Sequence, residues 1–374
     1  MRAYDPAARG PPQCPLRSGR TIANLTRVTK RNSTIDDVAK AAGVARVTVS
    51  RVLNNGQNVR PETRERVQRA VEILGYSVNQ QARALASGSG RQIVLIHAHN
   101  PEREPNSYYD AGLELGALRA CSSLGFDLIM RSIDPQAGDP WRAISPIVER
   151  ERPVGVILSP PLSDDAELLR TVRQADIGVV AISAGEDVRE IVSTVGIDER
   201  DGGHAIGQHL ISLGHRHLGF VKGPPDHRAA GLRYDGFLDA LREAGEDTDP
   251  WTGEGDFTFK SGVEAAEKLL RESNRVTALA CANDDMAAGA MFALHRAGLE
   301  IPSAISVTGF DDTPMSEVVW PPLTTVRQPI MDIAERAVHL LFEAPPDGPV
   351  RRERVAHALI VRESTAVANK FREA

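Results

Sequence analysis

The chain has few cysteines and aromatic residues and no long apolar run. Its three cysteines, Cys14, Cys121 and Cys281, are an odd number without CxxC spacing. We therefore expect neither a disulfide framework nor a structural zinc site, which is typical of a reduced cytoplasmic protein. No stretch of eighteen consecutive apolar residues occurs, so no membrane-spanning helix and no membrane partner are expected. The first twenty residues lack the apolar centre of a secretory signal.

Charge is distributed unevenly along the 374 residues. Residues 1–33 contain seven Lys or Arg and one acid, and residues 34–91 contain nine and five. The first 91 residues therefore carry a net charge of +10, and because the whole chain carries -6, the remaining 283 carry -16. A basic head on an acidic body indicates a polyanionic partner for the head alone. Charge by itself does not distinguish DNA from RNA or a membrane surface.

Residues 34–53, TIDDVAKAAGVARVTVSRVL, have the pattern of two short helices joined by a tight turn. Thr34 with Asp37 predicts a capping box at the start, and Gly43 predicts the end of the first helix. The apolar face of this helix is expected at Ile35, Val38, Ala39 and Ala42. The inward residues of the second helix are expected at Ala45, Val49, Val52 and Leu53. Its outward face carries groups suited to base edges and phosphates, namely Arg46, Val47, Ser50, Arg51 and Asn54. The alternative is an ordinary surface helix pair with solvated arginines.

A third helix is predicted to begin at Pro61 and to end before Gly75. Its apolar stripe is Val67, Ala70, Val71 and Leu74. Three helices around one small core make a headpiece of about 45 residues, which is marginal by itself. Residues 1–33 are predicted to be a disordered basic arm, unless a misassigned start codon produced them. Residues 79–90 contain one large apolar residue, Leu85, and their composition fits a plain linker and a conditional helix equally.

From Arg91 onward, short apolar runs alternate with helical stretches. The runs predict buried parallel strands at residues 93–96, 154–159, 177–183, 217–223, 277–283 and 304–310. Helices are predicted between them, for example at residues 110–124, 166–174, 202–213, 233–244, 262–271 and 286–297. This alternation predicts an α/β fold, and a length of about 270 residues indicates two lobes.

Polar residues follow several of these strands, where ligands bind in open α/β sheets. Those expected to converge are Ser159, Ser183, Asn283, Asp284, Asp285, Asp311 and Asp312, with Arg233 opening a helix. Tyr108, Tyr109 and Phe257 lie in predicted loops. Carboxylates, amides and a guanidinium make paired hydrogen bonds to vicinal hydroxyls, and aromatic rings stack on a sugar or a base. For each residue singly, turn formation or core packing explains it equally well.

Five blocks carry a family resemblance: TIDDVAKAAGVARVTVSRVLN, VRPETRERVQRAVEILGYSVNQQARALASG, HLISLGHRHLGFVKGP, GFDD and PPLTTVRQP. In order and spacing they resemble the LacI/GalR family of bacterial transcription regulators, from Thr34 to about Ala368. The resemblance implies a helix-turn-helix headpiece (34–78), a hinge helix (79–90) and a two-lobed core of parallel sheets like periplasmic sugar-binding proteins (91–369). It implies lobe crossings near 195, 324 and 342. The N-lobe then comprises about 91–195 and 324–341, and the C-lobe about 196–323 and 342–369.

The resemblance also assigns residues that contact DNA. Arg46, Val47 and Arg51 match positions that read bases in the major groove. Positions that hold phosphates are matched by Thr48, Ser50 and Asn54. The hinge helix is matched by Asn79, Ala82, Leu85 and Ala86. Leu85 matches the apolar wedge that enters the minor groove, which explains a lone large apolar residue in this segment.

In the core, Arg233, Asn283, Asp284 and Asp311 match effector-binding positions, and Phe257 matches the residue that stacks on the ligand. Tyr108 and Tyr109 match a loop that lines the pocket of relatives such as the purine repressor. Two departures concern ligand specificity: HAHNPEREPNSYY replaces the family's usual Asn-Pro-Phe-Phe loop, and Ser183 stands where many relatives have Asp. We favour a sugar or sugar derivative over a purine, because acidic groups outnumber basic ones. The resemblance does not say whether the effector releases or promotes DNA binding.

Two other functions compete with that of a DNA-binding regulator. A sugar-acting enzyme is disfavoured because no GxSxG, HExxH, P-loop or SxxK motif stands out, and the adjacent carboxylates Asp311 and Asp312 rarely span one bond. A secreted sugar-binding protein is disfavoured by the basic head. Solvated or capping roles explain the histidines at 204, 209, 215 and 217 better than a metal site does. We expect a cytoplasmic, nucleoid-associated homodimer without cofactor or metal. It should repress carbohydrate-catabolism genes from a roughly palindromic operator.

Overall fold

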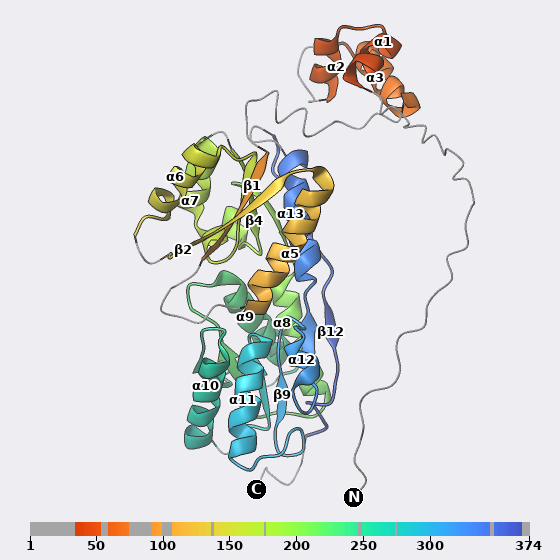
Figure 1. Cartoon of the computed structure of the whole chain (residues 1–374). Coiled ribbons are helices and arrows are strands. Elements are labelled where there is room, and N and C mark those ends of the chain that lie inside the picture. The colour runs from red at the N-terminus through yellow and green to blue at the C-terminus, as the bar shows by residue number, and fades with distance from the viewer. Residues whose placement is uncertain are drawn as a thin grey trace, which may run out of the picture. The chain divides into compact units, whose positions relative to one another are not determined.

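The computed structural model describes residues 34–53, 59–74, 91–98, 107–135, 138–175, 177–245, 249–273, 275–344 and 348–368 (Figure 1). The chain divides into two compact units, Met1–Val78 and Asn79–Ala374. Three expectations lie outside the described residues: the basic arm (1–33), the phosphate contact at Asn54, and the hinge segment (79–90).

The first unit is a bundle of three helices, α1 (Ile35–Ala42), α2 (Arg46–Leu53) and α3 (Pro61–Leu74). The predicted capping box is present, since Thr34 and Asp37 exchange side-chain and backbone hydrogen bonds, and Gly43 ends α1 at φ +64°. Val38, Val49 and Val67 are fully buried and form the centre of the core. Ala45 was wrongly placed inward. It is exposed because it precedes α2, where its carbonyl accepts hydrogen bonds from the first turn.

The N-lobe of the second unit is built on a parallel six-stranded sheet with the order β11-β5-β4-β3-β1-β2. Its strands are β1 (Gln92–Ala98), β2 (Asp127–Ile133), β3 (Gly155–Leu158), β4 (Gly178–Ile182), β5 (Ser193–Gly196) and β11 (Arg352–Arg354). Two short 3-10 helices, η1 (Leu162–Asp164) and η2 (Glu186–Val188), follow β3 and β4. The apolar runs predicted for β1, β3 and β4 are confirmed.

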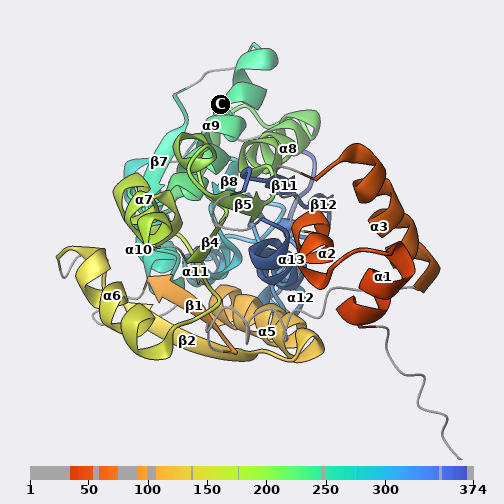
Figure 2. The same cartoon turned by 90° about the horizontal axis from the view of Figure 1, so that it is seen from above.

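Helices cover both faces of this sheet. α5 (Ser107–Leu124) and α13 (Ile330–Glu343) pack together on one face, and α6 (Pro140–Glu151) and α7 (Ala166–Gln174) cover the other. Figure 2 shows β4 between α7 and α13. Along β1, Ile93 and Leu95 join the core on the α5 side, whereas Val94 and Ile96 join the core on the α6 side. Both faces of β1 are buried, which is why the residues IVLI are all apolar and do not alternate with polar residues.

The C-lobe has a parallel four-stranded sheet with the order β7-β6-β8-β9. Its strands are β6 (Leu218–Lys222), β7 (Trp251–Glu254), β8 (Ala278–Cys281) and β9 (Ser306–Thr308). Its helices are α8 (Glu199–Ser212), α9 (Arg228–Glu243), α10 (Phe259–Glu272), α11 (Asp284–Arg296) and α12 (Met315–Val318). α8 packs on α9, and α10 packs on α11 (Figure 1). In the described parts of the chain, no helix combines the length and apolar character needed to cross a membrane.

Three segments connect the lobes. The chain leaves the N-lobe between β5 and α8 and re-enters it between β10 (Thr325–Arg327) and α13. We expected the third crossing near 342, and this was wrong. β11 lies beyond that point but pairs with β5 of the N-lobe sheet. The chain leaves the N-lobe only after β11, and β12 (Ala358–Ile360) then pairs with β10 in an antiparallel ribbon.

Candidate functional site

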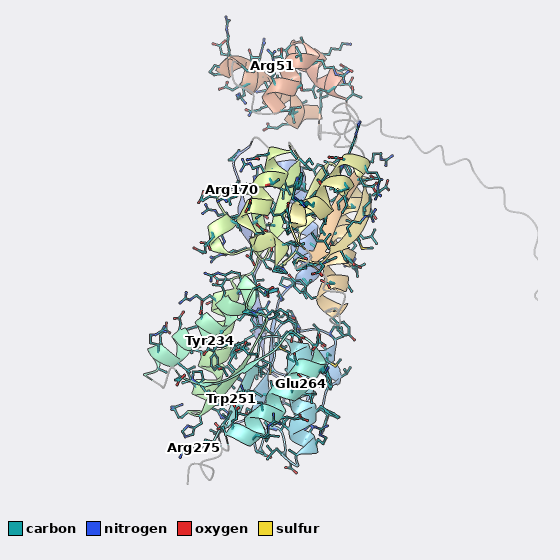
Figure 3. All side chains as sticks on the ribbon, turned by 90° about the vertical axis from the view of Figure 1, so that its left-hand side faces the viewer. Arg51, Arg170, Tyr234, Trp251, Glu264 and Arg275 are labelled. Atoms are coloured by element: carbon teal, nitrogen blue, oxygen red, sulfur yellow. The ribbon has the colours of Figure 1, made fainter. Side chains whose placement is uncertain are left out.

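Helix α2 presents the predicted DNA-reading face. Arg46, Val47 and Arg51 are exposed, and Val47 exposes 57% of its surface although it is apolar. Arg46 lies 3.6 Å from Asp36 of α1 in an open ion pair. Thr48 and Ser50 are half-buried beside this face, and Figure 3 labels Arg51 on the headpiece. Val49 and Val52 bury the opposite side of α2 in the core, so the predicted DNA-reading residues lie on its exposed side.

Arg233 is the centre of the site in the second unit. It lies in the second turn of α9, not at the start of the helix as expected, because α9 begins at Arg228. Gly203 of α8 has no room for a Cβ beside the Arg233 backbone, so the two helices pack closely there. The guanidinium donates from Nε to Glu199 (2.8 Å) and from Nη1 to the Ala282 carbonyl (2.7 Å). Its Cζ lies 3.9 Å from the centre of the Phe310 ring.

Asp311 faces Arg233 from the loop after β9. Its Oδ1 lies 3.5 Å from the Arg233 guanidinium and accepts a hydrogen bond of 2.5 Å from the Gln328 amide. The backbone of Asp311 is in the left-handed half of φ space, at φ +110°, a strained conformation that is characteristic of functional loops. Burial raises the pKa of the Asp311 carboxyl to about 7, although Arg233 and Gln328 lower it.

Asn283 positions the predicted stacking residue. Its side-chain oxygen caps α11 by accepting from the Met286 amide (3.0 Å), and its amide donates to the Phe257 carbonyl (3.0 Å). This bond holds Phe257 at φ +69°. The Phe257 ring meets His227 edge-on, with centroids 4.8 Å apart. Burial, with Arg233 nearby, lowers the pKa of His227 to about 3, so its ring is neutral.

The N-lobe contributes Tyr109 and Ser183. Ser183 follows β4 at φ +49° and is buried. The Tyr109 hydroxyl lies beside Ser183 and interacts electrostatically with Glu199, Arg233 and Asp311 of the C-lobe. Burial raises the pKa of Tyr109, so its hydroxyl remains a neutral donor. The structure therefore brings together residues from both lobes, such as Tyr109 and Asp311, which are 202 positions apart in sequence.

Four predicted residues do not join this cluster. Asp312 is paired instead with Arg327 at 2.5 Å and with Arg362 at 2.6 Å. Asp284 is fully buried, and its oxygens accept from the Thr313 amide (2.7 Å) and the Thr325 hydroxyl (2.6 Å), so it fixes the loop after β9. Burial raises its pKa. Ser159 is buried against the Ile96 carbonyl at 3.4 Å. Tyr108 is exposed in the first turn of α5, which begins three residues earlier than predicted and includes both tyrosines.

Sequence reasoning missed four residues of the site: Glu199, His227, Phe310 and Gln328. Glu199 follows β5, whose sequence STVG contains no apolar run that would predict a strand. The signal for Gln328 was its place in PPLTTVRQP, a block that was recognised without a role for this residue. His227 and Phe310 could be found only from their neighbours in space.

Comparison with known proteins identifies the type of molecule. Residues 34–79 match the bacterial regulatory proteins of the lacI family, and residues 207–365 match the periplasmic binding protein-like domain. The chain is 34% identical over 342 residues to the HTH-type transcriptional regulator CelR of Thermobifida fusca, covering 90% of this chain and 99% of that protein. The chain belongs to the lacI family. It is a DNA-binding transcriptional regulator with a periplasmic-binding-protein-like core, as the resemblance predicted.

Other relatives agree with this membership. Catabolite control protein A of Priestia megaterium is 32% identical over 315 residues, covering 83% of this chain and 92% of that protein. Among solved structures, a complex of the regulator CelR with cellobiose is 32% identical, with a TM-score of 0.67, covering 89% of this chain and 99% of that one. A lac repressor dimer bound to operator and the anti-inducer ONPF is 26% identical, with a TM-score of 0.67, covering 90% and 100%.

Proposed function

We propose that this lacI-family protein is a homodimeric repressor of carbohydrate-catabolism genes that a sugar or sugar derivative releases from a pseudo-palindromic operator. The buried cluster in which Arg233 contacts Glu199 and Asp311, close to His227 and its ring partner Phe257, carries the proposal. Such a cluster offers a paired donor, two acceptors and an apolar ring to vicinal hydroxyls and a sugar face. The relative solved with cellobiose and the relative solved as a dimer on operator support a sugar effector and a DNA-bound dimer.

On the DNA side, we assign base reading to Arg46, Val47 and Arg51 and phosphate contacts to Thr48, Ser50 and Asn54. The hinge assignment to Asn79, Ala82, Leu85 and Ala86 remains a prediction. We also propose that the protein is no enzyme and acts in the cytoplasm at the nucleoid, as expected for a transcription regulator. The relatives' regulatory function supports this proposal.

We propose that effector binding is transmitted to the DNA-binding end through the second crossing between the lobes, which runs from β10 to α13. The Asp311 amide donates to the Val326 carbonyl at 2.8 Å, and its carboxylate holds Gln328. Two residues later the chain begins α13, which packs on α5 of the N-lobe. A ligand that moves Asp311 therefore acts on the segment that sets the angle between the lobes. That angle alters the spacing of the two hinge segments of a dimer, and hence operator affinity.

The test is the Arg233→Ala variant, with Arg170→Ala as matched control. Arg170 is an exposed arginine on α7, outside the site (Figure 3). Binding to a labelled operator should survive in both variants, whereas release by sugars should be lost only in Arg233→Ala. Release of Arg233→Ala by the same sugar concentration that releases Arg170→Ala would contradict this placement of the effector site.

A purine-responsive corepressor is the second candidate. The HTH-type transcriptional repressor PurR of Erwinia tasmaniensis is 32% identical over 312 residues, and this similarity supports a purine-responsive corepressor as the second candidate. A purine base added to the same operator assay distinguishes the two functions. A corepressor tightens operator binding, whereas the sugar effector proposed here weakens it.

A further inference from the structure

Asp164 accepts hydrogen bonds from both lobes of the core. It is the last residue of η1 in the N-lobe, and its Oδ1 accepts from the amide of Gly185 (2.7 Å), which follows β4 in the same lobe. The carboxyl also accepts a hydrogen bond from the backbone amide of Arg228, the first residue of α9 in the C-lobe. One side chain therefore joins two N-lobe loops to the start of a C-lobe helix.

The start of α9 is suited to this contact. The Arg228 amide belongs to the first turn of a 16-residue helix, where backbone amides have no acceptor within the helix and the helix dipole favours a negative charge. The cap that α9 supplies itself, His227, accepts from the Ala230 amide at a long distance of 3.4 Å. Asp164 thus provides an acceptor and a negative charge at this helix end, and it does so from the other lobe.

Gly185 and Arg228 also pack against each other across the lobes. A Cβ atom on Gly185 would lie 2.8 Å from Cγ of Arg228, which is too close for two carbon atoms. Gly185 has φ -65°, a conformation open to any residue, so the turn itself does not require glycine. The missing side chain is what allows the Arg228 stem to lie on the N-lobe backbone.

Favourable and unfavourable contributions oppose each other at Asp164. Its Oδ2 is buried and has no hydrogen-bond partner among the described residues, which is unfavourable for a carboxylate. Burial raises the pKa of the Asp164 carboxyl, whereas the amides of Gly185 and Arg228 lower it. Such a balance suits a contact that the protein makes and breaks between two arrangements of similar free energy.

We propose that Asp164 is a latch that holds the two lobes together through the start of α9. The latch favours the closed arrangement, in which Tyr109 of the N-lobe lies near Arg233 and Asp311 of the C-lobe. A ligand that contacts both lobes then meets a form that is already populated, so its apparent affinity is higher. The effect on ligand affinity rests on the proposed function, whereas the latch between the lobes does not.

The latch is tested by hydrogen exchange of the full-length protein without ligand. Asp164→Ala should accelerate exchange about tenfold at the two amides that it binds, and also in the segments around Tyr109 and Asp311, which face each other across the lobes. Asp187→Ala, at an exposed aspartate of η2 in the same lobe, is the matched control and should leave all these rates unchanged. Acceleration at the two bound amides alone would make Asp164 a local cap and overturn the latch.

The contact between Gly185 and Arg228 gives a second test, in which Asp164 stays in place. Gly185→Ala should open the lobes and accelerate exchange around Tyr109, because its methyl group displaces the Arg228 stem. In the double variant with Arg228→Ala, the methyl group has room, so Gly185→Ala should add nothing to the exchange rates of Arg228→Ala alone. An equal effect of Gly185→Ala with and without the Arg228 side chain would contradict the contact across the lobes.

Titration calorimetry with glucose, galactose, mannose and xylose connects the latch to ligand affinity. A sugar that binds the unmodified protein should bind Asp164→Ala about three- to tenfold more weakly and Asp187→Ala equally well. Unchanged affinity in Asp164→Ala, together with faster exchange around Tyr109, would show that the latch does not set ligand affinity. If no sugar binds any of the proteins, the proposed function fails, and the exchange rates still decide whether the latch exists.

Discussion

Asp311 is the residue whose protonation should set the pH dependence of effector binding. The ordinary pKa of an aspartate is 3.8, and burial raises that of Asp311 to about 7. Because the pKa is higher in the folded protein, protonation of Asp311 stabilises the folded core. This contribution to the free energy of unfolding is fully present below pH about 4 and is lost as the pH rises through about 7. For binding, a sugar hydroxyl donates to the ionised form, so affinity should fall as pH decreases.

We therefore expect effector affinity to fall by up to about tenfold per pH unit below pH 7. Titration calorimetry between pH 8 and pH 5 measures the slope. The Asp311→Asn variant should bind more weakly at pH 8 and show a flat profile, because an amide does not titrate in this range. An unchanged slope in Asp311→Asn would assign the pH dependence to another group.

Thr34 is the residue that ties down the start of the DNA-binding unit. Its hydroxyl and amide both contact Asp37, and removal of such a cap costs about 1 kcal/mol. Thr34→Ala should therefore accelerate hydrogen exchange of the α1 amides about fivefold in the full-length protein. Lys40→Ala, at an exposed position of the same helix, is the control and should leave the exchange rates nearly unchanged.

The buried face of helix α2 stabilises the headpiece, and its exposed face is the one proposed to recognise DNA. Val49 is fully buried in the headpiece core, whereas Val47 is 57% exposed on the opposite side. Val49→Ala should destabilise the headpiece by about 1–3 kcal/mol and weaken all DNA binding together. Val47→Ala should change stability by less than about 0.5 kcal/mol and alter only the preference among operator sequences.

The measurement is the dissociation constant for operator and non-operator duplexes at one salt concentration. A parallel loss on both duplexes in Val47→Ala, with stability unchanged, would remove its base-reading role. Thermal unfolding of both variants gives the accompanying stability change.

The elements that the sequence predicted are those whose burial is uniform. β1, β3, β4, β6, β8 and β9 are buried along most of their length because helices cover both faces of their sheets, and all except β9, with the sequence SVT, are mainly apolar. β2 was not predicted, since it is an edge strand whose residues alternate irregularly between exposed and half-buried. β11 has the sequence RER at the opposite edge, so nothing in its composition indicates a strand. Missing β11 also caused the error in the third crossing.

The candidate site was predictable to the extent that its residues follow strands. Asp311 follows β9 and meets Arg233 of α9 as expected, but the same rule also selected Asp284. That residue binds Thr313 and Thr325, 29 and 41 positions away, and only the fold reveals such partners. Glu199 was missed because the strand before it, β5, has the sequence STVG and contains no apolar run.

At the scale of the whole molecule, Gln328 lies where effector binding meets lobe movement. It is 3% exposed, its amide holds Asp311 at 2.5 Å, and its carbonyl accepts from the first residue of α13 at 2.9 Å. Gln328→Leu keeps the side-chain size but removes the bond to Asp311. We expect sugar to bind this variant with modestly reduced affinity, while most of the coupling to the operator, roughly 1–3 kcal/mol in allosteric proteins, is lost.

Coupling is measured as the ratio of operator dissociation constants with and without saturating sugar. By reciprocity, sugar affinity with and without operator must give the same ratio, which checks the measurement internally. Gln174→Leu, an exposed glutamine at the end of α7, is the matched control and should retain the full ratio. If Gln328→Leu also retained it, transmission from the effector site to the hinge would have to run through another crossing, between β5 and α8 or after β11.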